Sequence, residues 1–238
     1  MSRGGALVTG SASGIGRGVV LALAREGYDV AVHYRRSAES AEATRSEAES
    51  YGARAVVLQA DLTDRVAARA LVREAHERLG GLTVLVNNVG DYLYKPLEEV
   101  TDEEWDDVLA TNLHATFATC QAAVPFLRKA GGGRIVNLGY AGAQSLVGRP
   151  NLTAYAIAKT GVVLLTKAIA RAEAASGVTA NVVAPGVIEN SATKPLHEIP
   201  AGREGRIDEV VAAVLYLVSD EAAYVTGQVL EVSGAWNL

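Results

Sequence analysis

The sequence predicts an α/β fold, built on a doubly wound parallel sheet of seven strands with helices on both faces. Three observations predict it. Short runs rich in Val, Ile, Leu and Ala are continuous rather than alternating, as in strands covered on both faces. Amphipathic stretches separate these runs, which gives a strand–helix rhythm from end to end. A glycine-rich turn follows the first run, as it does in folds of Rossmann type.

The elements follow this rhythm in order. Strands are expected at Ala6–Val8, Val30–His33, Ala55–Leu58, Val84–Val86, Ile135–Leu138, Ala180–Val183 and Val229–Val232. A helix-like segment follows each of the first six runs, such as Ala41–Tyr51 and Arg65–Leu79. No Pro/Ser-rich linker, composition break or internal repeat divides the chain, so we expect one domain over residues 1–238.

Composition narrows the functional classes. The 238 residues carry a net charge of −5 from 22 basic and 27 acidic side chains, without a basic stripe, which argues against binding to nucleic acid. The one cysteine, Cys120, lies in an apolar helical stretch and is expected to be a small buried side chain in a reducing cytosol. We find no apolar leader, no run of about 18 unbroken apolar residues and no metal-binding motif. We therefore expect a cytoplasmic protein without a membrane segment or a metal.

The turn after the first strand reads TGSASGIG over Thr9–Gly16. Its glycine spacing allows a sharp turn and a close approach of the backbone to a pyrophosphate, which the free N–H groups and dipole of the next helix attract. Two serine hydroxyls add phosphate donors. Six residues of this turn are expected to contact a dinucleotide cofactor: Gly10, Ser11, Ser13, Gly14, Ile15 and Gly16.

The second strand ends in a basic segment. A site that prefers NAD has an acid there to accept from the ribose 2′-hydroxyl, whereas arginine accommodates the 2′-phosphate of NADP. The first acid here is Glu39, while His33 is expected to be a packing residue at the strand end. A solvated basic turn is the other interpretation. The segment predicts contacts to NADPH/NADP from Tyr34, Arg35, Arg36 and Ser37.

Tyr155 and Lys159 lie one helical turn apart, so their side chains share a face. Hydride transfer to a carbonyl leaves a developing alkoxide that needs a proton. A free tyrosine titrates near pH ~10, and a neighbouring ammonium lowers that pKa. The pair therefore predicts carbonyl chemistry in which Tyr155 donates the proton and Lys159 lowers the pKa of the phenol.

Together, the glycine-rich turn and the Tyr155–Lys159 pair resemble motifs of the short-chain dehydrogenase/reductase family, and the resemblance covers nearly all of the chain. It implies that Lys159 also holds the nicotinamide ribose. It further implies that Asn112 supports a proton path to the lysine. A helix-bending core amide is a compatible interpretation of Asn112.

The resemblance implies further cofactor contacts after later strands. Asp61-Leu62 resembles the family's adenine-contacting acid and its neighbour, although a helix N-cap role is an alternative that Thr63 or Asp64 could fill equally well. Asn87–Gly90 resembles the Asn-Asn-Ala-Gly element, and Pro185–Ile188 resembles the segment whose backbone holds the nicotinamide carboxamide. The residues carried over are Asp61, Leu62, Asn88, Val89, Gly90, Pro185, Gly186 and Ile188.

The segment after the fifth strand departs from the family. Members usually read Val-Asn-Ile-Ser-Ser there, and the serine hydroxyl polarises the substrate carbonyl. This chain has Tyr140 in the serine's place, and the loop to Tyr155 is about two residues longer. We expect Tyr140 to replace the serine as a catalytic hydrogen-bond donor. Three alternatives stay open: Ser145 is the donor, no residue replaces the serine, or Tyr140 is a stacking wall.

Three segments are expected to face the substrate: Asp91–Leu97, Tyr140–Asn151 and Ile188–Arg203. Their aromatic side chains could stack on a flat substrate or only cover the cleft. In the third segment, Asn190 stands where the family often has a threonine, with Ser191 and Thr193 as nearby substitutes.

These features predict an NADPH-dependent carbonyl reductase that acts on a small-molecule carbonyl or alcohol. Pro200–Arg203 and Ser219–Gly227 resemble the 3-oxoacyl-acyl-carrier-protein reductases, while His33–Ser37 also resembles the pteridine reductases. A pterin-type substrate is therefore an enzymatic alternative. A catalytically idle protein that senses NADPH is the alternative outside the enzymes.

The resemblance also implies a symmetric assembly, a homotetramer or a homodimer. The family associates through the helix that carries the tyrosine, where Val162–Ala170 is apolar here, and through the C-terminal strand. Val229–Leu238 ends in apolar sequence that includes Trp236, which places Trp236 in this expected interface.

Overall fold

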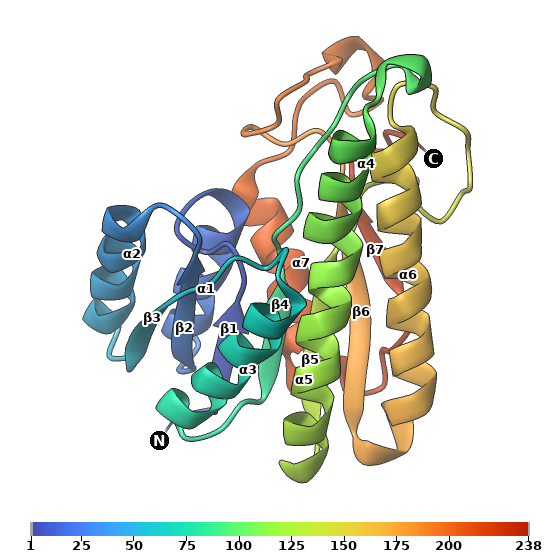
Figure 1. Ribbon diagram of the computed structural model, residues 1–238. Coiled ribbons are helices and arrows are strands. Elements are labelled where there is room, and N and C mark those ends of the chain that lie inside the picture. The colour runs from blue at the N-terminus through green and yellow to red at the C-terminus, as the bar shows by residue number, and fades with distance from the viewer. Residues whose placement is uncertain (1, 238) are drawn as a thin grey trace.

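The computed structural model describes residues 2–237 and confirms the predicted fold (Figure 1). Over this range, seven parallel strands form one sheet in the order β3-β2-β1-β4-β5-β6-β7. The strands are β1 (Gly5–Val8), β2 (Asp29–Tyr34), β3 (Ala55–Gln59), β4 (Val84–Asn87), β5 (Gly133–Leu138), β6 (Val178–Pro185) and β7 (Val229–Val232). Every predicted strand is present, and β6 is longer at both ends than its predicted core.

Helices cover both faces of the sheet. They are α1 (Gly14–Arg25), α2 (Ala38–Ser50), α3 (Arg65–Leu79), α4 (Asp102–Leu109), α5 (Ala115–Lys129), α6 (Thr153–Glu173) and α7 (Ile207–Val218). Helices α1, α2 and α7 pack on one face, and α3 and α5 pack on the other, where α6 also contributes Ala170. Helix α3 matches its predicted range, while α2 begins three residues earlier than predicted.

The core explains why the strands read as continuous apolar runs. Successive strand residues point to opposite faces, and here both faces are covered. Val8 and Val86 pack beneath α1 and α7, whereas Leu7 and Leu85 pack beneath α3 and α5. All four side chains are fully buried.

A series of hydrogen bonds between buried polar side chains links α5 to α6 by way of β4 and β5. Thr119 Oγ1 donates to Asn87 Oδ1 at 2.7 Å, and Asn87 Nδ2 donates to Asn137 Oδ1 at 2.8 Å. Asn137 Nδ2 then donates to Thr166 Oγ1 at 2.8 Å. Cys120 is buried beside these amides, and burial raises the pKa of its thiol to about 12, which agrees with the expected packing role. This series of hydrogen bonds fixes α6 against β5.

One stretch of the described residues, Thr153–Ser176, is long and apolar enough to cross a membrane, with a mean hydropathy of 1.2. Core helices of folded domains share this composition. Here α6 packs against β6, and its buried side chains include Ala158, Val162 and Thr166. These are the contacts of a core helix.

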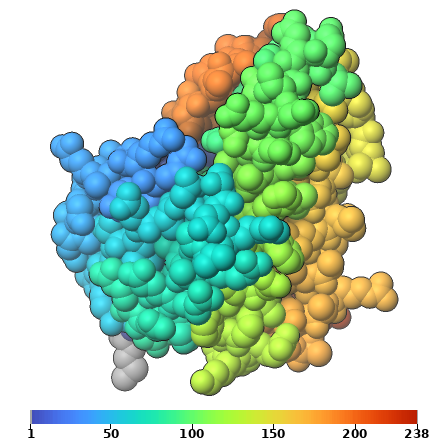
Figure 2. Space-filling model, viewed as in Figure 1, coloured from blue at the N-terminus to red at the C-terminus, as the bar shows by residue number. Residues whose placement is uncertain are grey.

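The carboxyl edge of the sheet carries the long loops. The segments after β4, β5 and β6 extend together beyond this edge (Figure 1). In the space-filling view, the green and orange segments stand above the blue N-terminal segments (Figure 2). Ligands of open α/β sheets bind outside the carboxyl ends of the strands, so this edge is where a site is expected.

Candidate active site

The glycine-rich turn brings its backbone close to the end of β4. Gly10 and Gly14 have positive φ values of 63° and 56°, which favour glycine. A Cβ on Gly16 would lie 2.4 Å from the Gly10 carbonyl oxygen and 2.6 Å from Asn88 Nδ2, so no larger residue fits there. The turn opens α1 at its N-terminus, where a phosphate is stabilised.

Buried His33 supports the turn from below. Its Nδ1 accepts from the Gly10 N–H at 2.9 Å. Burial lowers the pKa of His33 to about 4, so the ring is neutral at physiological pH and can accept this bond. The residue therefore has the expected structural role.

The two serines of the turn differ. Ser11 is fully buried, where its hydroxyl donates to Val8 O at 2.8 Å and accepts from the His33 N–H at 3.0 Å. The expectation that Ser11 is a phosphate donor is therefore corrected: its hydroxyl joins β1 to β2 instead. Ser13 is exposed at the N-cap of α1 without a side-chain cap bond, so its hydroxyl remains free for a ligand.

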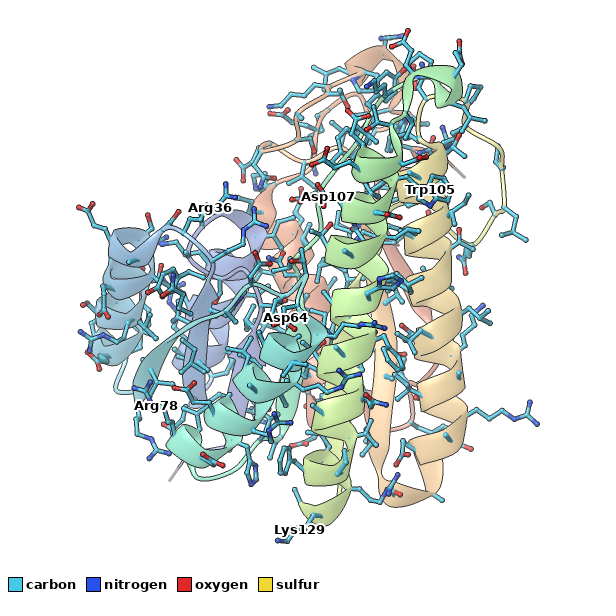
Figure 3. The ribbon with its side chains drawn as sticks, in the orientation of Figure 1. Arg36, Asp64, Arg78, Trp105, Asp107 and Lys129 are labelled. Atoms are coloured by element: carbon cyan, nitrogen blue, oxygen red, sulfur yellow. The ribbon has the colours of Figure 1, made fainter. Side chains whose placement is uncertain are left out.

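A cavity of about 480 Å³ joins the turn to the ends of β2, β3 and β4. It collects most of the residues predicted to hold the adenosine half of a cofactor. They are Gly10, Ser13, Tyr34, Arg35, Arg36, Ser37, Asp61, Leu62, Asn88, Val89 and Gly90. Figure 3 shows Arg36 at this edge of the sheet.

Asp61 lines this cavity and does not cap α3, whose N-cap is Asp64. Its carboxylate accepts from the Thr63 N–H and hydroxyl, which together with the nearby Arg35 hold the pKa of Asp61 below its usual value. Arg35 Nη1 lies 4.0 Å from Asp61 Oδ1. Asp64 accepts from the Val66 N–H at 2.7 Å and is the N-cap of α3 (Figure 3). The capping alternative for Asp61 is thus filled by Asp64.

Thr9 fixes the end of β4 against the glycine-rich turn, a role that the sequence did not reveal. Its buried hydroxyl accepts from the N–H groups of Asn88 and Val89 at 2.9 and 3.2 Å. In return, Asn88 Nδ2 donates to Thr9 O and to Gly10 O. A threonine that begins a glycine-rich motif gives no separate signal in a sequence.

A second cavity of about 320 Å³ lies beside the first and is lined by the residues that are predicted to take part in the reaction. Tyr155, Lys159 and Tyr140 line it from one side, and the segment after β6 lines it from the other. The predicted cofactor residues along its wall are Ile15, Asn88, Gly90, Pro185, Gly186 and Ile188.

Lys159 is buried at the end of β5. Its Nζ donates to Leu138 O at 2.7 Å and lies 5.7 Å from the centre of the Tyr155 ring. Burial lowers the pKa of Lys159 to about 8, because the charged form loses its hydration.

The pKa of Tyr155 shifts in the direction opposite to the one expected. Burial raises its pKa well above the usual range, and the neighbouring Tyr92 and Tyr140 add to the increase. The prediction that Lys159 lowers this pKa is therefore corrected: the lysine is directed to Leu138 O rather than to the phenol. The phenol is fully protonated at neutral pH.

Asn112 lies in a π-helical turn, Ala110–His114, between α4 and α5. Its Nδ2 donates to Asp91 O and to Val108 O, both at 2.9 Å, while its buried Oδ1 has no partner among the described residues. A Cβ on Gly90 would lie 2.2 Å from this oxygen and 3.2 Å from Lys159 Nζ. The free amide oxygen therefore lies close to the lysine, as a proton path requires, and the helix is also locally bent from α geometry.

Tyr140 lies against Tyr155, whereas Ser145 does not. The centres of the two tyrosine rings are 5.5 Å apart, and Tyr140 is 7% exposed. Burial raises the pKa of Tyr140, and the nearby Arg149 guanidinium opposes the increase. Ser145 is exposed and lies outside the residues that line the cavity. Of the two proposed donors, the structure brings only Tyr140 into the cavity.

The substrate-facing loops are only partly as predicted. Tyr92 lines the cavity with its ring edge-on to Tyr155 at 5.2 Å, but Tyr94 is exposed outside it and accepts from Asn151 Nδ2. The Ile188 N–H, expected to be free for a carboxamide, donates to Ser191 Oγ at 2.9 Å. This N–H is therefore already hydrogen-bonded to the Ser191 hydroxyl and is not free for a ligand.

Several residues that line this cavity were not predicted as site residues, and they include Leu138, Gly139, Leu152 and Trp236. Leu152 is buried against it and reads in the sequence like any apolar residue before a helix. Trp236, which the sequence placed only in an expected subunit interface, lines the cavity within this chain. Among residues 2–237, no three His, Cys, Asp or Glu side chains come together as metal ligands.

The chain was compared with known proteins. A family model described as Enoyl-(Acyl carrier protein) reductase matches residues 10–237. The 3-oxoacyl-[acyl-carrier-protein] reductase FabG of Staphylococcus aureus strain N315 is 40% identical over 238 residues, covering 96% of each chain. The FabG protein of Escherichia coli K12 is 36% identical and covers 96% of this chain and 95% of that protein.

Solved structures agree with this relationship. A blue fluorescent protein from a metagenomic library, in complex with NADPH, has a TM-score of 0.92 at 34% identity and covers 100% of this chain and 99% of its own. Acetoin dehydrogenase from Enterobacter cloacae has a TM-score of 0.91 at 31% identity, covering 99% and 96%. The cavities, the Tyr155–Lys159 pair and these matches show that the chain is an oxidoreductase of the short-chain dehydrogenase/reductase family, similar to the FabG proteins.

Proposed function

We propose that this protein is an NADPH-dependent carbonyl reductase. The observation that carries the proposal is the placement of Tyr155 and Lys159 in one cavity beside the glycine-rich turn, with the free Asn112 oxygen buried close to the lysine. The residues fit a dinucleotide, since Gly10 and Gly14 give the turn its tight backbone at the N-terminus of α1 and Ser13 leaves a free hydroxyl. A nicotinamide bound there supplies the hydride.

The protonation states of Tyr155 and Lys159 are compatible with the reduction of a carbonyl. The Tyr155 phenol carries its proton at neutral pH and can donate it to the alkoxide that forms in the cavity. Lys159 is charged below pH about 8 and adds positive charge near the same atoms. Asn112 Oδ1 can accept a hydrogen bond on the lysine side, which supports return of a proton to Tyr155.

Arg35 and Arg36 support the choice of NADPH. Both line the adenosine cavity with Ser37, at the end of the strand where cofactor preference is read. Asp61 shares this cavity, but it is engaged by Thr63 and lies close to Arg35. Arg36 and the Arg35 guanidinium, which is paired with Asp61 at 4.0 Å, therefore both border the place where a 2′-phosphate would bind.

The names of the relatives support a 3-oxoacyl thioester or a small hydroxyketone as the class of substrate. The resemblance to pteridine reductases rests on His33–Ser37, which lies at the cofactor cavity rather than at the substrate cavity. The resemblance therefore supports the preference for NADPH and gives no reason to propose a pterin as the substrate.

We also propose that Tyr140 replaces the family's serine. Its ring lines the substrate cavity next to Tyr155, and the guanidinium of Arg149 partly offsets the effect of burial, which raises the pKa of the Tyr140 phenol. The exposed position of Ser145 argues against the alternative donor.

A cytoplasmic homotetramer or homodimer is proposed from the family resemblance. Residues Val162 and Ala170 of α6 are buried within the chain, so they are not available to a second subunit. Ile157 and Leu164 are 48% and 69% exposed and give α6 an apolar outer face for such a contact.

The first prediction tests the reaction itself. The protein should oxidise NADPH in the presence of an activated diketone such as butane-2,3-dione, followed by absorbance at the reduced nicotinamide band. Tyr155→Phe should lower kcat by ~10²–10⁴-fold, the usual worth of a general acid, with little change in the Kd of NADPH. A Tyr155→Phe protein that keeps more than about a tenth of its rate would contradict the general-acid role. NADPH binding without turnover of any carbonyl would favour the idle sensor.

The second prediction concerns the cofactor. Charge-assisted bonds to a phosphate contribute about 1.5–3 kcal/mol each, so NADPH should bind at least ~10-fold more tightly than NADH. Changing Arg35 and Arg36 together to Ala should remove most of the difference, measured as Kd by titration calorimetry. The matched control is Arg45→Ala, which changes a half-buried arginine of α2 outside the cavity. Equal Kd values for the two cofactors in the unaltered protein would rule out the assignment.

The third prediction separates the proposed donors. Tyr140→Phe keeps the ring and removes only the hydroxyl, so loss of a catalytic donor should lower kcat by ~10²–10³-fold at saturating NADPH. Ser145→Ala should leave kcat unchanged. A change in KM alone for Tyr140→Phe would indicate a stacking wall, and a change in kcat of less than about threefold would show that Tyr140 is not the donor.

A further inference from the structure

Trp236 enters the substrate cavity from the C-terminal end of the chain. It follows β7 by four residues, yet it lines the same cavity as Tyr155, Tyr140 and Tyr92. Four aromatic rings from four separate segments therefore surround the cavity, together with the buried Leu152.

Two loops hold the indole of Trp236 in place. Its Nε1 donates to Glu198 Oε2 at 3.3 Å, which connects it to the loop after β6. The guanidinium carbon of Arg149 lies 5.9 Å from the centre of the indole ring, within the range of a cation–π contact. Arg149 belongs to the lengthened loop between β5 and α6, so Trp236 joins the two loops that border the cavity.

The backbone of this turn is held in an unusual conformation. Ala235 and Asn237 have positive φ values of 68° and 65°, a region that residues other than glycine rarely adopt. The conformation is maintained by contacts outside the turn: the Ala201 N–H donates to Gly234 O at 3.1 Å, and Asn237 Nδ2 donates to Ala141 O at 3.3 Å. Strained backbone of this kind is typical of segments whose position serves a function.

We infer that Trp236 is a specificity-determining residue that limits the size of the group attached to the reacting carbonyl carbon. The inference rests on the proposed carbonyl reduction and adds the substrate class: compounds with a compact substituent on that carbon. The indole is anchored at its N–H edge by Glu198 and contacted by Arg149, so it cannot withdraw without breaking both contacts. A fixed wall rejects a larger group by steric exclusion.

The test compares two diketones that differ only at one substituent. Butane-2,3-dione carries a methyl group where 1-phenylpropane-1,2-dione carries a phenyl group. In Trp236→Ala, the ratio of kcat/KM for the phenyl compound to kcat/KM for the methyl compound should rise at least ~10-fold, since a change of one small group in a shaped pocket is worth about 10–200-fold. Tyr224→Ala, which removes a fully exposed ring, should leave the ratio unchanged.

An unchanged ratio in Trp236→Ala would overturn the inference, and so would a lower ratio, because that result would mean that the indole stacks on the phenyl group. If the unaltered protein reduces neither diketone nor any other carbonyl with NADPH, the proposed function itself fails and the inference fails with it. An active protein with an unchanged ratio overturns the role of Trp236 alone.

A second measurement does not depend on the folding of Trp236→Ala or on turnover. The sequence has two tryptophans, so Trp105→Phe leaves Trp236 as the only indole. With NADP⁺ present, its emission should change saturably as butane-2,3-dione is added, because the ligand binds against the ring. A linear change, equal to that of N-acetyltryptophanamide in the same titration, would show that the diketone does not bind beside Trp236.

Discussion

The hydrogen bond from Lys159 Nζ to Leu138 O places the helix of the proton donor at the end of β5. It is supported from within by the buried bond from Asn137 Nδ2 to Thr166 Oγ1, two helical turns further along α6. Removing either partner of such a pair would leave a buried polar group without a partner, which costs about 1–3 kcal/mol. The position of Tyr155 therefore depends on polar contacts that lie beneath the cavity.

Enclosure of the cavity by aromatic side chains sets its chemistry. Desolvation, with smaller contributions from Tyr92 and Tyr140, raises the pKa of the Tyr155 phenol, while burial brings the pKa of Lys159 down to about 8. The protonated Tyr155 can donate a proton to the reduced carbonyl, and Lys159, with a pKa of about 8, can gain or lose a proton near neutral pH. The long loop that supplies Tyr140 also supplies Arg149, which contacts both that tyrosine and Trp236. The loop that replaces the family's serine with Tyr140 therefore also provides the contact to Trp236, on another part of the cavity wall.

Much of this could be predicted from the sequence, because continuous apolar strands and the glycine-rich turn are local patterns. The strands, α3 and most of the predicted residues of both cavities were found in this way. Ser11 and the Ile188 N–H were assigned to the cofactor, yet each is bonded to a neighbour that only the folded chain brings near. Trp236 was missed as a cavity residue because its position depends on Glu198, 38 residues earlier. The raised pKa of Tyr155 likewise depends on burial in the folded chain, to which Tyr92 and Tyr140 from distant loops add.

The pH dependence of carbonyl reduction tests the central claim, that a buried Lys159 serves a protonated tyrosine. The kcat/KM for the carbonyl at saturating NADPH should be constant at neutral pH and fall about tenfold per pH unit above about 8, where Lys159 loses its charge while Tyr155 keeps its proton. Lys159→Arg, which stays charged, should move this decline to higher pH. A profile that stays flat or rises to pH about 10, the ordinary pKa of tyrosine, would contradict the account.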